Sequence, residues 1–265
     1  MTLRRAQATG TYSTLESHMV FDGIIFDFNG VLWWDGHLQQ RSWRQFSAQI
    51  RGKPLSDEEM AVHVHGRYNG HTLAYLLGRP VGGTELHQLI QQKEIIYRQM
   101  CLDQGDGFQL SDGAVELLDF LVFHDIPRTI ATASERTNVD FFREHLDLDR
   151  WFDPGLIVYD DGRRPGKPAP DIYLQAAANL GLSPDRCVVV EDSLSGLRAA
   201  HAAGVGYLVA LGPGASQGRL ARIEGVARVV ESLREVPKEA LFLRTASAGL
   251  DDPALAEHLE TGGEP

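Results

Sequence analysis

The chain has little cysteine, no excess of positive charge and no long apolar segment. Its two cysteines, Cys101 and Cys187, are too few for a disulfide framework, and their scarcity indicates a reducing compartment. The 25 Lys and Arg residues face 36 Asp and Glu residues, and the net charge of -11 argues against a basic surface for nucleic acid or anionic lipid. No apolar run reaches the roughly 18 residues of a membrane-spanning helix. We therefore expect a cytoplasmic protein whose partners include neither nucleic acid nor membrane.

The composition that remains is typical of a globular chain, with 43% hydrophobic and 23% charged residues. A length of 265 residues is about twice that of a usual domain, so we expect a large core with an inserted or appended unit. Residues 1–19 have no periodic apolar face and are predicted to be a disordered extension. Residues 245–265 contain five acidic residues and no Lys or Arg, which predicts an acidic disordered tail.

Strand and helix patterns alternate through most of the chain. Short apolar runs, mostly continuous as in strands buried on both faces, predict strands at Val20–Phe28, Ile126–Ala133, Leu156–Tyr159, Arg186–Glu191 and Val205–Leu211. Periodic apolar positions before and between the last four runs predict helices at Gly113–His124, capped by Ser111-Asp112, and at Thr137–Leu146, Pro170–Leu180 and Ser195–Ala203. The alternation predicts an α/β fold with a parallel sheet flanked by helices, formed by residues 20–35 and 111–244.

Residues 36–110 contain three or four helical patterns and no convincing strand. Trp43, Phe46 and Ile50 share one helix face, and Ser56 with Glu59 has the spacing of a capping box. We predict that this segment is a small helical domain inserted after the first strand. Its place is the carboxyl edge of the sheet, which is where open α/β sheets bind ligands.

Polar side chains end several of the predicted strands or precede a helix at the same edge. They are Asp27 after the first strand, Thr132 and Ser134 at the end of the second, Lys167 before a helix, and Glu191 with Asp192 after the fourth strand. The carboxylates offer the hard oxygen ligands that Mg²⁺ prefers, and a lysine with a hydroxyl can hold phosphoryl oxygens. Asp27 can then attack phosphorus and form an aspartyl-phosphate. The pattern predicts Mg²⁺-dependent phosphoryl transfer.

In order and spacing these motifs resemble the four motifs of the haloacid dehalogenase superfamily. The segments that carry the resemblance are Asp27-Phe28-Asn29-Gly30-Val31, Thr132, Lys167-Pro168 and Glu191-Asp192. Gly166-Lys167-Pro168-Ala169-Pro170-Asp171 and Trp43 make the chain similar to the β-phosphoglucomutase-like branch. The resemblance implies a Rossmann-like core with an inserted four-helix cap at residues 36–110.

The resemblance also implies roles for individual residues. Asp27 corresponds to the nucleophile, and Thr132 with Lys167 to the pair that orients the phosphate. The implied metal ligands are Asp27, the main-chain carbonyl of Asn29, Glu191 and Asp192. The implied substrate contacts are Ser134, Asn138 and Lys93, together with the cap segment that contains His65, Gly66, Arg67 and Asn69.

Three positions depart from the pattern of the branch. Asn29 stands where the superfamily has the Asp that acts as general acid and base, and an amide cannot exchange a proton at neutral pH. Gln39 stands where the mutases commonly have His, and Asn69 where they often have a basic residue. All three weaken the mutase reading, whereas a phosphohydrolase reading is affected less.

We therefore predict a Mg²⁺-dependent phosphatase that acts on a small phosphorylated metabolite, for example a sugar phosphate. We expect it to be a monomer or a weak homodimer. Two alternatives remain open. One is a β-phosphoglucomutase-like phosphomutase, and the other is a catalytically weak protein that binds a phosphorylated ligand.

Overall fold

A computed structural model describes residues 21–64 and 69–243 of the chain, so the predicted terminal extension and tail lie outside the described residues. The described part falls into two units. The larger unit spans Asp22–Val236 and contains the sheet. The smaller one comprises Phe21 and residues 237–243, with helix α10 (Lys238–Phe242), and within it the Phe21 amide donates to the Leu241 carbonyl at 2.8 Å.

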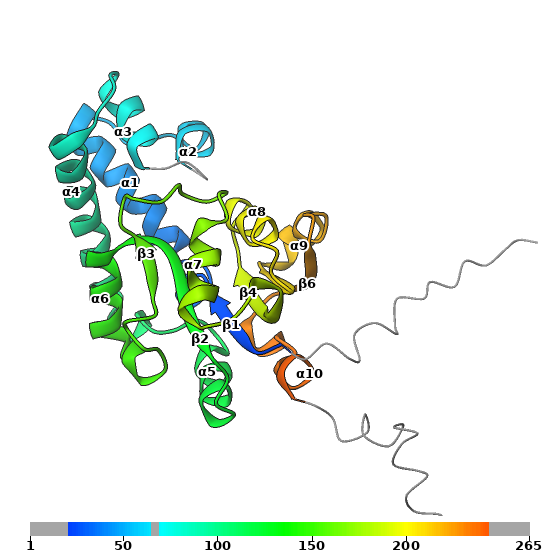
Figure 1. The fold of residues 1–265 in the computed structure, drawn as a ribbon. Coiled ribbons are helices and arrows are strands. Elements are labelled where there is room, and N and C mark those ends of the chain that lie inside the picture. Colours follow the sequence, from blue (N-terminus) through cyan, green and yellow to red (C-terminus); the bar gives the residue numbers. More distant parts are fainter. Residues whose placement is uncertain (1–20, 65–68, 244–265) are drawn as a thin grey trace, which may run out of the picture. The chain divides into compact units, whose positions relative to one another are not determined.

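The larger unit is built around a six-stranded sheet whose paired strands are all parallel, in the order β3-β2-β1-β4-β5-β6 (Figure 1). The strands are β1 (Gly23–Phe26), β2 (Arg128–Glu135), β3 (Val158–Asp160), β4 (Cys187–Glu191), β5 (Tyr207–Leu211) and β6 (Val226–Val230). The prediction of an α/β parallel sheet is confirmed, with the first five strands within a few residues of their expected positions. The chain runs outward from β1 to β3 and then returns to β4 on the other side of β1.

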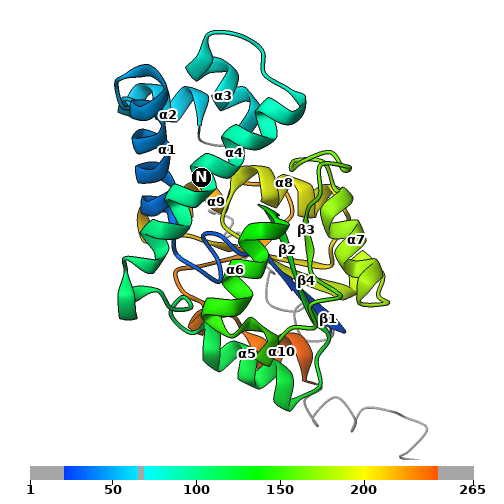
Figure 2. The ribbon, with the colours of Figure 1, turned by 90° about the vertical axis from the view of Figure 1, so that its left-hand side faces the viewer.

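Helices cover both faces of the sheet because its central strands are apolar on both sides (Figure 2). On one face Ile25 and Val189 pack with residues of helices α7 and α8. On the other face the ring of Phe26 contacts Phe152 and that of Phe28 stacks on Phe142 at 4.3 Å. The helices between the strands are α5 (Ala114–Phe123), α6 (Arg136–Leu146), α7 (Asp171–Asn179), α8 (Leu194–Ala202) and α9 (Gly214–Leu220).

The predicted cap at the start of α5 is wrong. The N-cap residue is Gly113, with φ of 79°, and no side chain caps the helix. The Asp112 carboxylate instead pairs with Arg234 at 2.9 Å. Glycine adopts this left-handed backbone easily, and a Cβ at this position would overlap the backbone of Leu233 and Arg234.

Helices α1 (Gly36–Arg51), α2 (Asp57–His63), α3 (Asn69–Leu77) and α4 (Gly83–Leu102) occupy the long connection between β1 and α5. They group together beyond one end of the sheet in Figures 1 and 2. An apolar cluster that includes Trp43, Phe46 and Leu73 holds them to one another. The predicted capping box is present, since Ser56 accepts from the amide of Glu59 and Glu59 accepts from the amide of Ser56. We refer to residues 36–110 as the helical insertion.

The sixth strand and α9 were not predicted. Ala227 and Arg228 in the middle of β6 are exposed, because the strand lies at the edge of the sheet, so it lacks the continuous apolar run of the others. Among residues 21–64 and 69–243, none of the helices combines the length and apolar character that crossing a lipid bilayer requires.

Candidate active site

The first acidic residue of the site follows the central strand. Asp27 comes directly after β1, and its amide donates to the carbonyl of Val190 on β4 at 3.0 Å. Register pairs Phe26 with Val190, so Asp27 lies beside Glu191, the last residue of β4. Strands β2 and β3 lie on one side of β1 and strands β4 to β6 on the other, so the strand order switches sides between β1 and β4. Such a switch point is where a parallel sheet opens a crevice at its carboxyl edge.

Lys167 reaches this edge from the loop before α7. Its ammonium donates to Asp27 Oδ1 at 2.7 Å, to Glu191 Oε1 at 2.9 Å and to the Ala131 carbonyl at 3.3 Å. The lysine side chain is 7% exposed, and its Nζ lies 4.9 Å from the centre of the Tyr173 ring. Segments that are 140 residues apart in sequence therefore form one buried ion-paired cluster.

A third carboxylate completes the cluster. Carboxylate oxygens of Asp27, Glu191 and Asp192 lie within 4.8 Å of one another, which is the spacing of ligands around one cation. Gly30, with φ of 83°, passes so close to the Asp192 carboxylate that a Cβ would overlap it. The backbone at this point therefore requires glycine both for its conformation and for this close approach.

The first turn of α8 fixes Glu191. The Ser193 amide donates to Glu191 Oε2 at 2.6 Å, and the Ser193 hydroxyl donates to Oε1 at 3.2 Å. The same hydroxyl caps the helix by accepting from the amide of Gly196. A Cβ at Gly196 would overlap the Glu191 carboxylate, so the helix start is built against this side chain.

Burial and mutual repulsion govern the titration of the cluster. Burial raises the pKa of Asp27 to about 7, with Glu191 adding to the effect and Lys167 opposing it. Burial and the charges of Glu191 and Asp27 also raise the pKa of Asp192 well above its ordinary value. For Lys167 burial favours the neutral amine, but the Asp27 and Glu191 charges outweigh it and raise its pKa well above the ordinary value. Three carboxylates around one ammonium leave an excess of negative charge, which favours a divalent cation.

The two hydroxyl residues of β2 differ in what they contact. Thr132 is 1% exposed, and its hydroxyl accepts from the amide of Ser134 at 3.1 Å. The Ser134 hydroxyl donates to Oδ1 of Asn29 at 2.7 Å. Ser134 thus joins the strand next to β1 to the loop that follows β1.

Asn29 has further partners that sequence reasoning missed. Its amide nitrogen donates to Asp35 Oδ2 at 2.8 Å and to the Tyr97 hydroxyl at 3.2 Å. Asp35 Oδ2 also accepts from the Tyr97 hydroxyl at 2.6 Å and from Gln39 at 3.0 Å. Burial raises the pKa of Asp35, and burial together with the charge of Asp35 raises the pKa of Tyr97 well above its ordinary value. The sequence offers one signal for Asp35, a carboxylate at the start of a predicted helix, but that signal indicates a cap.

Lys93 and Asn138 lie in the same polar network but not beside Asp27. Lys93 Nζ donates to Gln39 at 2.7 Å and to Glu94 at 3.0 Å, with 2% of the residue exposed. Asn138 of α6 donates to Glu94 at 2.8 Å and accepts from Arg98 at 2.6 Å. Both residues therefore connect helix α4 of the insertion to neighbouring elements through buried hydrogen bonds.

The remaining predicted substrate contacts belong to the insertion. His65, Gly66 and Arg67 lie outside the described residues. Asn69 is the first residue of α3 and is half-buried.

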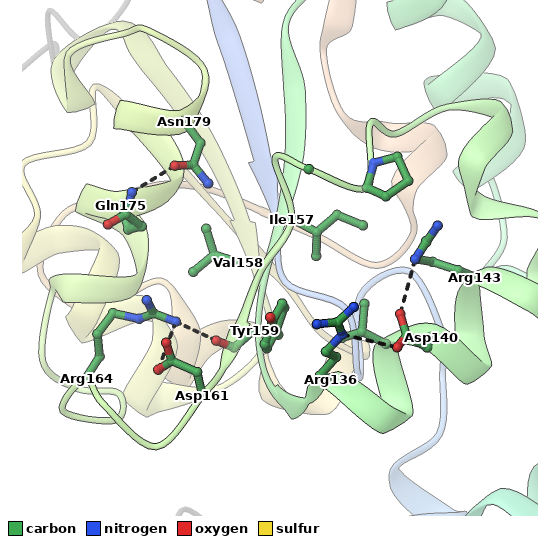
Figure 3. Close-up of a pocket in the computed structure, with 13 residues that line it drawn as sticks. Arg136, Asp140, Arg143, Ile157, Val158, Tyr159, Asp161, Arg164, Gln175 and Asn179 are labelled. Atoms are coloured by element: carbon green, nitrogen blue, oxygen red, sulfur yellow. Dashed lines mark hydrogen bonds and ion pairs between the residues drawn. The ribbon is translucent and has the colours of Figure 1, made fainter.

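A cavity of about 460 Å³ lies elsewhere, between α6, β3 and α7 (Figure 3). Three arginines line it, and each has an acidic partner: Arg136 and Arg143 pair with Asp140, and Arg164 pairs with Asp161. None of the residues predicted for the active site lines this cavity. The partners offset the charge of the guanidinium groups, so the cavity has little to hold an anion.

Comparison with known proteins finds similar sequences over most of the chain. A family model described as haloacid dehalogenase-like hydrolase matches residues 21–204. The "Phosphorylated carbohydrates phosphatase" of Thermotoga maritima is 27% identical over 223 residues, covering 83% of this chain and all of that protein. The "Beta-phosphoglucomutase" of Mycobacterium bovis is 27% identical over 240 residues, covering 80% of this chain and 90% of that one.

One relative is longer and one is a solved structure. The chain spans 47% of the length of the chloroplastic "5-amino-6-(5-phospho-D-ribitylamino)uracil phosphatase" of Arabidopsis thaliana, with 27% identity over 180 residues that cover 68% of this chain. The crystal structure of a family IA, variant 3 hydrolase from Entamoeba histolytica superposes with a TM-score of 0.78 and 34% identity. That superposition covers 83% of this chain and 96% of the other.

Proposed function

The chain belongs to the haloacid dehalogenase-like hydrolases, and on that premise we propose that it is a Mg²⁺-dependent phosphatase of small phosphorylated metabolites, with Asp27 as nucleophile. One observation carries the proposal. The carboxylate of Asp27 lies at the switch point of the sheet, held by Lys167 and next to two further carboxylates.

In the proposed reaction the Asp27 carboxylate attacks phosphorus, and the bond from phosphorus to the leaving oxygen breaks as the aspartyl-phosphate forms. The Lys167 ammonium holds the attacking carboxylate in orientation and offsets charge on the phosphoryl oxygens. A water molecule then attacks the phosphoenzyme, which releases inorganic phosphate and restores the carboxylate. Thr132 and Ser134 are proposed to contact the phosphate and the substrate from β2, the strand beside β1.

The donor set fits Mg²⁺, since three carboxylates converge beside one ammonium and their oxygens are hard ligands. Asp27, Glu191, Asp192 and the main-chain carbonyl of Asn29 would hold the ion. When bound, it supplies charge neutralisation for the phosphoryl group and for the clustered carboxylates.

The substrate class rests on the relatives, which include a phosphatase named for phosphorylated carbohydrates. We propose a phosphorylated sugar or related metabolite, with the helical insertion acting as the cap that excludes water from the site. Both amide hydrogens of Asn29 have protein acceptors, so this side chain has none to give a leaving oxygen. Aryl and acyl phosphates, whose leaving groups are stable anions, are therefore expected to react faster than simple alkyl esters.

The proposal is tested by hydrolysis of para-nitrophenyl phosphate with Mg²⁺ and with excess EDTA. Turnover should require the metal, and Asp27→Asn should lower kcat by at least about 10³-fold. Asp119→Asn is the matched control, because Asp119 on α5 accepts from Trp151 and Arg150 and belongs to no part of the site. Equal turnover by Asp27→Asn would refute the nucleophile assignment. A wild-type chain that binds orthovanadate with Mg²⁺ but hydrolyses no phosphate ester would instead be a binding protein.

A further inference from the structure

The side chain of Asn29 has nearly all its hydrogen-bonding capacity committed. A primary amide has two donor hydrogens and an oxygen with two acceptor sites. Both hydrogens have acceptors, Asp35 Oδ2 at 2.8 Å and the Tyr97 hydroxyl at 3.2 Å. The oxygen accepts from Ser134 at 2.7 Å, which leaves one acceptor site. In this arrangement Asn29 is an acceptor toward any further group.

Asp35 is what distinguishes the two ends of this amide. An ionised carboxylate only accepts, so the nitrogen of Asn29 must face it, and the reverse orientation would place two oxygens against each other. Tyr97 alone does not impose this choice, because a hydroxyl both donates and accepts. Asp35 is 1% exposed, and its Oδ2 accepts from three side chains, so its own position is fixed.

The position of Asp35 in its helix supports a role directed at Asn29. Asp35 is the N-cap residue of α1, a place where Asp is favoured because its carboxylate can accept from the first amides of the helix. It makes no such bond. The carboxylate instead points to Asn29, to Tyr97 on α4 and to Gln39 one turn into α1. Helix capping therefore does not account for an acid at this position.

We propose that Asp35 is a positioning residue that fixes Asn29 as a hydrogen-bond acceptor in the active site. The kinetic part of this inference rests on the proposed phosphatase function. With its oxygen held toward Ser134, Asn29 can accept a hydrogen bond from a water molecule or from a substrate hydroxyl, and it cannot donate to a leaving oxygen. Removal of the Asp35 carboxylate leaves the amide free to rotate.

Exchange of the two side chains tests the proposal. Asp35→Asn removes the charge that selects the orientation, and Asn29→Asp places a second carboxylate against the first. The double variant Asn29→Asp/Asp35→Asn restores one carboxylate and one amide across the same contact. We expect Asp35→Asn to lose about tenfold in kcat on para-nitrophenyl phosphate with KM within about threefold of wild type. The double variant should have a higher kcat than Asn29→Asp, whose new carboxylate faces that of Asp35.

Glu59→Gln is the matched control. Glu59 is another carboxylate of the insertion that accepts from a tyrosine hydroxyl, Tyr75, at 2.6 Å, and it also pairs with Arg51. It has no contact with Asn29. A purely structural loss in the insertion should lower Tm in this variant and leave kcat unchanged.

Two results would overturn the proposal. One is wild-type kcat and KM in Asp35→Asn, and the other is a double variant in which the factors by which the two single changes alter kcat simply multiply. If the wild-type chain hydrolyses nothing, the proposed function fails.

The contact between Asp35 and Asn29 is then tested by Tm alone. We expect Asn29→Asp to lower Tm and the double variant Asn29→Asp/Asp35→Asn to restore it. Additive changes in Tm would refute the pairing of Asp35 with Asn29.

Discussion

Replacement of Lys167 by methionine isolates the charge that holds the active site together. The ammonium lies 2.7 Å from Asp27 and 2.9 Å from Glu191, in a side chain that is 7% exposed. Methionine has a similar length and no charge, so the variant retains most of the packing on Tyr173. What is lost is the partner of two buried carboxylates.

The magnitude follows from the geometry. At these separations each pair attracts by about 6 kcal/mol if the effective dielectric constant is about 20. Desolvation of the three charged groups opposes that attraction, and removing one partner of a buried ion pair costs about 3–5 kcal/mol in practice. We expect Lys167→Met to lower the free energy of unfolding by that amount at pH 8 in EDTA. At pH 6 the loss should be smaller, because Asp27, with a pKa of about 7 even beside Lys167, then takes up a proton.

The assay is urea unfolding at pH 6 and pH 8, followed by circular dichroism, with EDTA throughout. The double variant Lys167→Met/Asp27→Asn is compared with Lys167→Met, since it removes one of the two carboxylates that lose their ammonium partner. It should be more stable than Lys167→Met alone. Equal unfolding midpoints for wild type and Lys167→Met at pH 8 would refute the reasoning, and so would a double variant whose losses simply add.

Three further predictions concern other features of the larger unit. Gly196→Ala, a change that usually favours a helix, should destabilise the chain by about 1–3 kcal/mol in urea unfolding and reduce turnover, because the new Cβ overlaps the Glu191 carboxylate. Without metal, burial raises the pKa of Asp27 in the folded chain from its ordinary value of 3.8 to about 7, so Tm in EDTA should fall as pH rises through this window, and Mg²⁺ should reduce the fall. Ser56→Ala should cost about 1 kcal/mol in urea unfolding by removing the capping box of α2 and leave kcat unchanged.

The parallel sheet could be predicted because its central strands are short, apolar and separated by helical patterns. The same logic placed Asp27 and Glu191 at one edge, since carboxyl ends of parallel strands meet there. Edge strand β6 could not be predicted, because Arg228 and its neighbour Ala227 are exposed and break the apolar run. Strand burial is thus the property that the sequence pattern reports.

The polar network at the insertion could not be predicted, because its contacts depend on how helices pack. Lys93 is an example. The resemblance placed it toward the substrate, and the structure places its ammonium on Gln39 and on Glu94, its immediate neighbour in sequence. Glu94 then accepts from Asn138 on α6. Whether a buried lysine meets a substrate or an internal acid is decided by tertiary packing that leaves no local pattern in the sequence.

The departures at Asn29 and Gln39, which look independent in the sequence, meet at one atom in the structure. Both amides donate to Asp35 Oδ2, at 2.8 and 3.0 Å. A carboxylate at position 29 would face that of Asp35, and a protonated imidazole at position 39 would offer Lys93 no acceptor in place of the Gln39 oxygen. Buried polar networks are stable when every member has a partner. The amides at 29 and 39 both donate to the Asp35 carboxylate, so any change at one of these three positions is expected to alter the effect of changes at the other two.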